Sequence, residues 1–167
     1  MEEIIRWDNL KRVLEEFGNE LRNTYQDKLI RDDKIATGEL LNSVEYKIDY
    51  DDRSITLSLE LAEYWKWVEE GREPGGAYPP WDDPNEGILN WIKMKPVVPE
   101  ERNGVLPTEK QLAFLIARKI AEEGIEPGYQ LRDAKKDLMD DFEEKIDEAI
   151  TLDVQQYLDV IFSSYFN

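Results

Sequence analysis

The sequence predicts an α+β fold: a small curved antiparallel sheet with helices packed on it, followed by a long C-terminal helical extension. Apolar residues recur at helical spacing from Leu10 to Leu29. They then alternate with polar residues between positions 44 and 61, and return to helical spacing after position 108. Helices and strands that occupy separate stretches of a chain favour α+β. We expect residues 1–130 to form the main domain and residues 131–167 the extension.

The composition excludes several kinds of chemistry. The 167 residues suffice for one domain, or one domain with an appendage, and include neither cysteine nor histidine. Disulfides, thiolate metal sites and cysteine nucleophiles are therefore impossible, and the usual proton shuttle is missing. The formal net charge is −17, from 38 acidic and 21 basic residues. Because an acidic surface repels phosphate, we expect no role in gripping or reading DNA.

A first helix is predicted from Asp8, a suitable N-cap, to the charged run at positions 31–34. Gly18 interrupts its apolar stripe and should weaken the helix by up to about 1 kcal/mol. The stripe, which predicts one packed face, contains Leu10, Val13, Leu14, Phe17, Leu21, Tyr25 and Leu29.

A β-hairpin is predicted next. Thr37 is expected to cap a single helical turn that ends at Ser43. Apolar and polar residues then alternate over positions 44–50 and 55–61, on either side of the polar run at 51–53. This pattern predicts two strands with one apolar face. Because two strands alone are marginally stable, we expect a further strand from a loop region or from a neighbouring subunit.

Short helices and turn-rich loops make up the middle of the chain. A helix over 63–70 is expected to end at Gly71, and a shorter helix covers 88–92. Loops rich in glycine and proline are predicted at 71–85 and 96–107.

The two most regular helices lie in the C-terminal half. Thr108 and Gln111 form the pattern of a capping box at the start of a helix that ends at Gly124. A long helix begins at Leu131 and continues to residue 167. The residues expected to face inward are Leu112, Leu115, Ile116 and Ile120 in the first helix, and Leu138, Phe142, Ile146, Ala149 and Ile150 in the second.

Aromatic residues are concentrated between positions 64 and 91. Trp and Tyr are favoured anchors of protein interfaces, and they also pack around small sheets, so both interpretations are open. Adjacent helical residues cannot share one face, so at least one ring is expected to be covered by something other than the local core. The cluster consists of Tyr64, Trp65, Trp67, Tyr78, Trp81 and Trp91.

The loop over 71–85 carries glycines outside any nucleotide-binding frame. Gly75-Gly76 lacks both the GxGxxG pattern and the Lys-Ser/Thr that follows a P-loop. Pro79-Pro80-Trp81 predicts an extended segment that loses little entropy on docking, or alternatively an ordered surface loop.

Acidic pairs such as Glu122-Glu123 and Asp140-Asp141 recur along the chain. Neighbouring carboxylates on a helix point about 100° apart and do not converge on one ion. No EF-hand spacing is present, so these pairs indicate solvated faces. No serine or threonine lies in a nucleophile-elbow frame. The sequence therefore predicts no catalytic site, no metal site and no cofactor.

Residues 152–167 are more apolar and aromatic than the charged helix before them. We expect this segment to face a protein partner, with packing back on the domain as the alternative. A membrane surface is disfavoured because the segment has no Lys or Arg, and neither a signal peptide nor a membrane span is expected. The residues predicted to face the partner are Tyr157, Ile161, Phe162, Tyr165 and Phe166.

Several segments together resemble a known protein family. In order, they are TGxLxxSV at 37–44, YxxWVEEGRxPG at 64–75, the Pro-Pro pair at 79–80, ILxWI at 88–92 and AFLIARKIxxxGIxP at 113–127. The ordered set resembles the neck, head–tail joining or tail-completion (tail terminator) proteins of tailed bacteriophages.

The resemblance implies a structural, non-enzymatic virion protein. Its copies would form a homo-oligomeric ring that joins the capsid portal or connector to the tail, in contact with other neck and tail proteins. DNA would pass through the ring without specific binding, which suits the net charge. Assembly would take place in the cytoplasm of the bacterial host. The contacts between subunits or rings are predicted to involve Tyr64, Trp65, Trp67, Glu69, Arg72, Tyr78, Pro79, Pro80, Trp81 and Trp91.

Two other functions compete with this one. An acidic adaptor or inhibitor could use the Trp-rich loop to clasp one protein partner, and would then form a one-to-one complex without self-association. An enzyme could use carboxylates and a divalent metal, and metal would then stabilise its fold.

Overall fold

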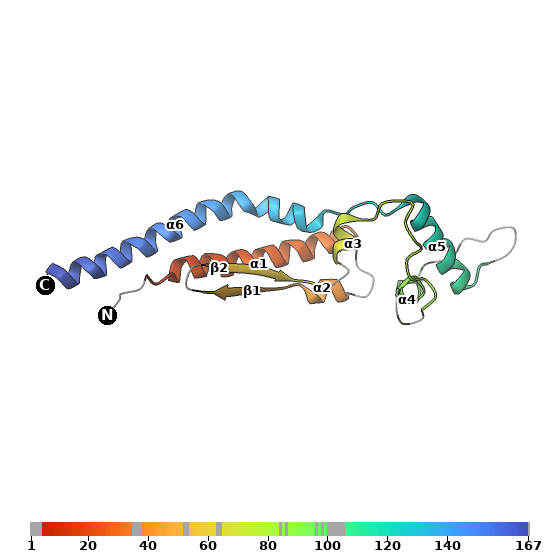
Figure 1. The fold of residues 1–167 in the computed structure, drawn as a ribbon, viewed down its shortest axis with the longest axis horizontal. Coiled ribbons are helices and arrows are strands. Elements are labelled where there is room, and N and C mark those ends of the chain that lie inside the picture. The colour runs from red at the N-terminus through yellow and green to blue at the C-terminus, as the bar shows by residue number, and fades with distance from the viewer. Residues whose placement is uncertain are drawn as a thin grey trace. The chain divides into compact units, whose positions relative to one another are not determined.

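The computed structural model describes residues 5–34, 38–51, 54–62, 65–83, 85, 87–95, 97, 99 and 106–166. Within these residues the chain forms six helices and one two-stranded antiparallel sheet, which confirms the predicted α+β fold with a long C-terminal helix (Figure 1). None of the described helices is long and apolar enough to cross a membrane. The elements are α1 (Asp8–Arg31), α2 (Glu39–Ser43), β1 (Glu45–Tyr50), β2 (Ile55–Glu60), α3 (Trp65–Glu70), α4 (Gly87–Met94), α5 (Glu109–Glu123) and α6 (Gln130–Phe166).

The chain divides into two compact units, and each unit combines separate segments of the sequence. Unit 1 consists of Met1–Lys28, Val44–Glu60 and Leu131–Asn167, whereas unit 2 consists of Leu29–Ser43 and Leu61–Gln130. Unit 1 therefore contains most of α1, the β-hairpin and nearly all of α6. Unit 2 contains α2, α3, α4 and α5.

In unit 1, α6 runs beside α1 (Figure 1). The rings of Phe17 and Phe142 stack, with 3.8 Å between their centroids and 20° between their planes. Nearer the end of α1, the Lys28 ammonium lies 2.7 Å from a carboxylate oxygen of Asp137. The predicted stripe of α1 supplies most of the buried residues of the unit, which include Val13, Leu14, Phe17, Leu21, Tyr25, Ala134 and Ala149.

The hairpin contacts α1 at Gly18. The Tyr46 ring lies so close that a β-carbon at Gly18 would come within 2.6, 2.8 and 2.9 Å of three ring carbons. Next to the glycine, Asn19 donates a side-chain N–H to the Tyr46 hydroxyl at 2.9 Å. The Lys11 ammonium lies 5.0 Å from the centre of the Tyr50 ring. The glycine that weakens the helix locally therefore makes room for the hairpin.

The two strands pair antiparallel, with Ile48 opposite Leu57. At the turn, the Asp51 N–H donates to the Ser54 carbonyl at 3.0 Å. Hydrogen-bonded and non-hydrogen-bonded pairs alternate along an antiparallel ladder, so Ile48 and Leu57 form a non-hydrogen-bonded pair. Their backbone N–H and C=O groups consequently point towards the two edges of the sheet. Within the described residues no third strand joins either edge.

A carboxylate from α6 caps the start of α1. The Asp153 side chain, only 1% exposed, accepts hydrogen bonds from the backbone N–H groups of Asn9 and Leu10, each at 3.0 Å. The Asn9 side-chain amide donates a third at 2.8 Å. First-turn N–H groups have no partner within a helix, and the helix dipole favours a negative charge at this end. Asp8, the predicted N-cap, lies instead in the first turn of α1.

In unit 2, α4 and α5 pack together around a small core. Ile88, Leu89 and Ile92 of α4 contact Ala113 and Ala117 of α5. Partly buried side chains close the margins of this core: Trp81, Val97, Leu112, Ile116 and Ile120.

The buried face of α5 consists of alanines at every fourth position: Ala113, Ala117 and Ala121. Small side chains on this face allow close approach of the neighbouring elements. Leu115, which was expected to face inward, is 36% exposed, so that prediction is wrong. It lies two residues after Ala113, about 200° away around the helix.

The caps and turns of unit 2 largely follow the sequence pattern. The capping box of α5 is confirmed, because the Thr108 hydroxyl accepts from the Gln111 N–H and the Gln111 side chain accepts from the Thr108 N–H at 2.9 Å. Thr37, the predicted cap of α2, lies outside the described residues. Gly71 follows α3 with a φ of +68°, as a helix C-terminus favours.

Backbone hydrogen bonds join the start of the 71–85 loop to the segment that follows α5. Arg72 and Ile125 form an isolated antiparallel bridge, with N–H···O distances of 2.9 and 2.8 Å. Gly71 lies so close to the Ile125 carbonyl that a β-carbon would not fit there. The loop region thus contributes one bridge and no full strand to the described sheet structure.

Candidate interaction surface

The predicted aromatic cluster is divided between exposed and packed rings. Trp67 of α3 is 59% exposed, Tyr78 is 50% exposed and Trp91 of α4 is also exposed. Trp65 is half-buried, and Tyr64 lies outside the described residues. The exposed rings are therefore accessible to a partner.

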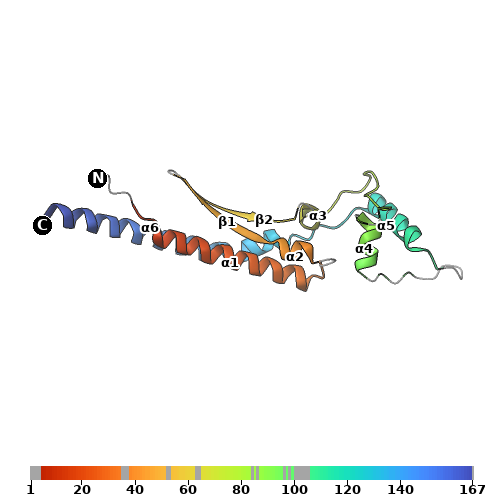
Figure 2. The ribbon, with the colours of Figure 1, turned by 90° about the horizontal axis from the view of Figure 1, so that it is seen from below.

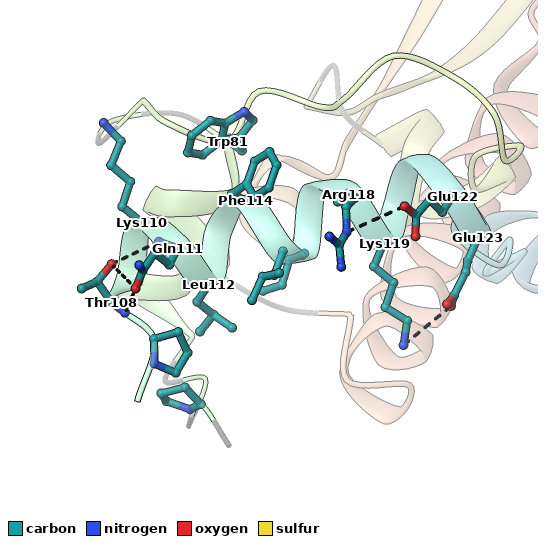
Figure 3. Close-up of a pocket in the computed structure, with 14 residues that line it drawn as sticks. Trp81, Thr108, Lys110, Gln111, Leu112, Phe114, Arg118, Lys119, Glu122 and Glu123 are labelled. Atoms are coloured by element: carbon teal, nitrogen blue, oxygen red, sulfur yellow. Dashed lines mark hydrogen bonds and ion pairs between the residues drawn. The ribbon is translucent and has the colours of Figure 1, made fainter. Parts of the chain in front are cut away.

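Trp81 packs on its own chain. Its ring meets Phe114 of α5 edge-on, with 5.3 Å between centroids and 68° between planes, and it also covers the core between α4 and α5 (Figure 3). Tyr78 approaches the same Phe114 ring at 5.8 Å and 74°. Phe114 therefore holds two aromatic rings of the 71–85 loop against α5, and the Gly75 N–H adds a hydrogen bond to the Ala121 carbonyl of α5 at 2.7 Å.

Of four further residues of the predicted interface, Glu69 lies in α3 and the other three lie in this loop. The Glu69 side chain is buried. Arg72 donates a side-chain N–H to the Ala77 carbonyl, which curls the Gly-Gly segment around its guanidinium. Pro79 is half-buried and Pro80 exposed, and the Pro80 carbonyl accepts the Ile88 N–H at 3.1 Å. These contacts hold the loop in place.

An open groove of about 1030 Å³ runs along the outer side of α5, and we call it the α5 groove (Figure 3). Its volume lies at the upper end of the range usual for ligand pockets, and it is partly open to solvent. Its apolar lining includes Trp81, Pro107, Leu112, Phe114, Leu115 and Ile116.

Charged side chains form the rim of the α5 groove. Arg118 lies 3.7 Å from Glu122, and Lys119 lies 3.6 Å from Glu123. Both pairs are exposed, so each contributes well under about 1 kcal/mol and the charges can be redirected to a partner. Lys110 adds a third cation to the lining. Cations thus outnumber carboxylates here, in a chain whose net charge is −17.

The second predicted surface is the end of α6. Tyr157 and Ile161 are half-buried and Phe162 is exposed, while the side chains of Tyr165 and Phe166 lie outside the description. Two residues that were not predicted here, Leu158 and Val160, are 42% and 54% exposed. Ile150, expected to face inward, is also exposed.

Within the described residues, no group of three or more Asp, Glu, His or Cys side chains is arranged to hold a metal ion. The buried carboxylate of Asp153 caps α1 instead.

Sequence reasoning missed the α5 groove. The available signal was the Ala113, Ala117 and Ala121 repeat, since a helix that buries its alanines must turn its larger neighbours outward. That orientation places Phe114 and Leu115 on the groove side. The predicted inward set left out the three alanines and wrongly included Leu115, whereas Leu112, Ile116 and Ile120 do pack against the core.

Comparison with known proteins gave no match: no family model, no curated protein and no solved structure is similar to this chain.

Proposed function

We propose that this chain is a structural subunit of the neck or tail of a tailed bacteriophage. Its copies form a homo-oligomeric ring between the capsid portal or connector and the tail, and DNA passes through that ring. The ordered segments between positions 37 and 127, which resemble neck and tail-completion proteins, motivate this assignment. The protein acts by assembly rather than by catalysis.

The observation that carries the proposal is a two-stranded sheet whose edges are both open within the described residues. Exposed strand edges are templates for pairing with another chain, and two strands are few for a stable sheet. In a closed ring, β1 of one subunit can pair with β2 of the next. This contact is heterologous, because it joins two different surfaces. When the ring closes, both edges of every sheet are covered.

Exposed aromatic residues and the overall charge support the same role. Trp67 and Tyr78 offer large side chains of the kind that anchors interfaces. Trp81 and Arg72 contribute by holding the loop in shape. A net charge of −17 gives DNA no reason to adhere inside the ring.

The mass and shape of the purified full-length chain provide the first test. We expect light scattering after gel filtration to give one fixed multiple of the 19.7 kDa subunit, and negative-stain images to show closed rings. A chain that stays monomeric up to high concentration and forms only a one-to-one complex with another protein would contradict the proposal and favour the adaptor function.

Hydrogen exchange tests the role of the sheet edges without any substitution. In the ring, the amides of Ile48 and Leu57 should exchange on the order of tenfold more slowly than in dissociated subunits, because a neighbouring strand protects them. Lys47 and Ser58 form the adjacent, hydrogen-bonded pair and serve as internal controls. Rings in which Ile48 and Leu57 still exchange rapidly would show that subunits meet elsewhere.

A further inference from the structure

The β-hairpin has one covered face and one bare face. α1 runs along the hairpin (Figures 1 and 2) and contacts the side that carries Tyr46 and Tyr50. Because side chains alternate along a strand, their neighbours in sequence point the other way. That second face, which we call the polar face, has only one side chain that is not exposed, Ser58. Its residues are Glu45, Lys47 and Asp49 of β1, and Thr56, Ser58 and Glu60 of β2.

The charges of the polar face suit contact with water. It carries three carboxylates and one ammonium. Glu45 lies directly opposite Glu60 in the antiparallel register, and Lys47 lies 2.8 Å from Asp49 of the same strand. A helix or sheet packed on this face would bury carboxylates that have too few cations to pair with, which costs free energy. The acidic balance also repels phosphate groups.

In the proposed ring, the hairpins join into one closed sheet. Pairing β2 of each copy with β1 of the next gives a barrel with two strands from every copy. Copies in a ring are related by rotation, so all the polar faces lie on the same side of this barrel. If that side were the outer one, every α1 would lie inside, and helices about 10 Å across would fill the bore. The polar face therefore belongs on the inside.

The number of strands sets the width of such a barrel. Strands about 4.8 Å apart and tilted by about 40° each add about 2 Å to the diameter. Side chains occupy about 5 Å at each wall, half the distance between two stacked sheets. Six copies would leave a free bore of about 14 Å, and eight copies a bore of about 22 Å. Duplex DNA, about 20 Å across, passes only the wider barrel.

We infer that the polar face of the hairpin lines the DNA passage and that the ring contains at least about eight copies. This inference rests on the proposed function, from which it takes the pairing of β1 with β2 and the passage of DNA. It adds a lower limit for the number of copies and names the side chains that face the DNA. A bore with an excess of carboxylates lets DNA slide through without adhering.

Native mass spectrometry of the full-length protein tests the number of copies. Dividing the mass of the ring by the 19.7 kDa of the chain gives that number, which should be about eight or more. Rings of six or fewer copies would overturn the inference and leave ring formation itself intact. A chain that forms no ring would contradict the proposed function, and the inference would fall with it.

A change of charge on the polar face tests which side chains face the DNA. Rings of Glu45→Lys are mixed with linear duplex DNA, whose ends are then joined by ligase. Rings that encircle the DNA stay on the closed circle at high salt and leave when the circle is cut. We expect several-fold more DNA to be retained than by native rings, since a cation from every copy then faces the phosphates. Thr56→Lys, at an exposed position of the same face, should act alike.

Asp147→Lys is the matched control, because it makes the same change of charge at an exposed position of α6. It should retain much less DNA than Glu45→Lys at high salt. Equal retention by the two variants would overturn the assignment of the polar face. Retention of DNA circles that were closed before mixing would overturn it as well, since a closed circle cannot enter the bore.

Discussion

Replacing Asp153 by alanine is expected to lower the free energy of unfolding by about 2–4 kcal/mol. The carboxylate accepts three hydrogen bonds from Asn9 and Leu10 while almost fully buried. Without it, two N–H groups at the start of α1 lose their partner, and the contact between the start of α1 and α6 is lost. Urea unfolding followed by circular dichroism measures the effect.

Two further variants separate the cap from the loss of side-chain volume. Asp153→Asn keeps one acceptor oxygen but turns an amide donor towards other donors, so a loss of about 1–2 kcal/mol is expected. Asp147→Ala removes an exposed aspartate from the same helix and should change stability by less than about 0.5 kcal/mol. Similar losses for Asp153→Ala and Asp147→Ala would refute a capping role.

The dependence of stability on pH gives an independent check. Burial by itself raises the pKa of Asp153, but hydrogen bonds from Leu10 and Asn9, together with the nearby charge of Lys11, outweigh it and hold the pKa below its ordinary value of 3.8. A lowered folded-state pKa stabilises the fold above the unfolded-state value, and this stabilisation is lost as pH falls through the folded-state value. The stability difference between the native chain and Asp153→Asn should therefore be constant above about pH 5 and shrink below about pH 4.

Gly18→Ala is expected to destabilise the protein although alanine is the better helix former. Alanine improves helix propensity by up to about 1 kcal/mol, whereas forcing a methyl group into the Tyr46 ring costs about 1–3 kcal/mol. The ring carbons would lie at 2.6, 2.8 and 2.9 Å from the new β-carbon, so the hairpin has to shift. Thermal or urea unfolding should show a net loss of up to about 2 kcal/mol.

The double variant with Tyr46→Ala isolates the cause. Once the ring is removed, Gly18→Ala should become stabilising by up to about 1 kcal/mol, because only the propensity gain remains. A change of sign between the two backgrounds is thus the expected result. An equal effect of Gly18→Ala in both backgrounds would show that the Tyr46 ring does not decide this position.

Local sequence patterns predicted the α+β class and the order of the described helices and strands. The apolar stripe of α1, the alternation in β1 and β2, and the Thr108–Gln111 capping box involve residues close together in the chain. The spacing of their apolar residues and their side-chain chemistry favour one local conformation without any contact to a distant segment. The α+β class follows directly from that order of elements.

Contacts between distant segments decided which side chains are buried, capped or exposed. Asp153 caps a helix that begins 145 positions earlier, and Gly18 is needed because Tyr46 lies on it. On α5, the alanines face the core and Leu115 lines the groove, since close packing against α4 favours small side chains over large ones. Sequence periodicity shows which residues share a face of a helix, but not which other element packs on that face. On α5, the packing of α4 against the alanine face leaves Phe114 and Leu115 to line the α5 groove.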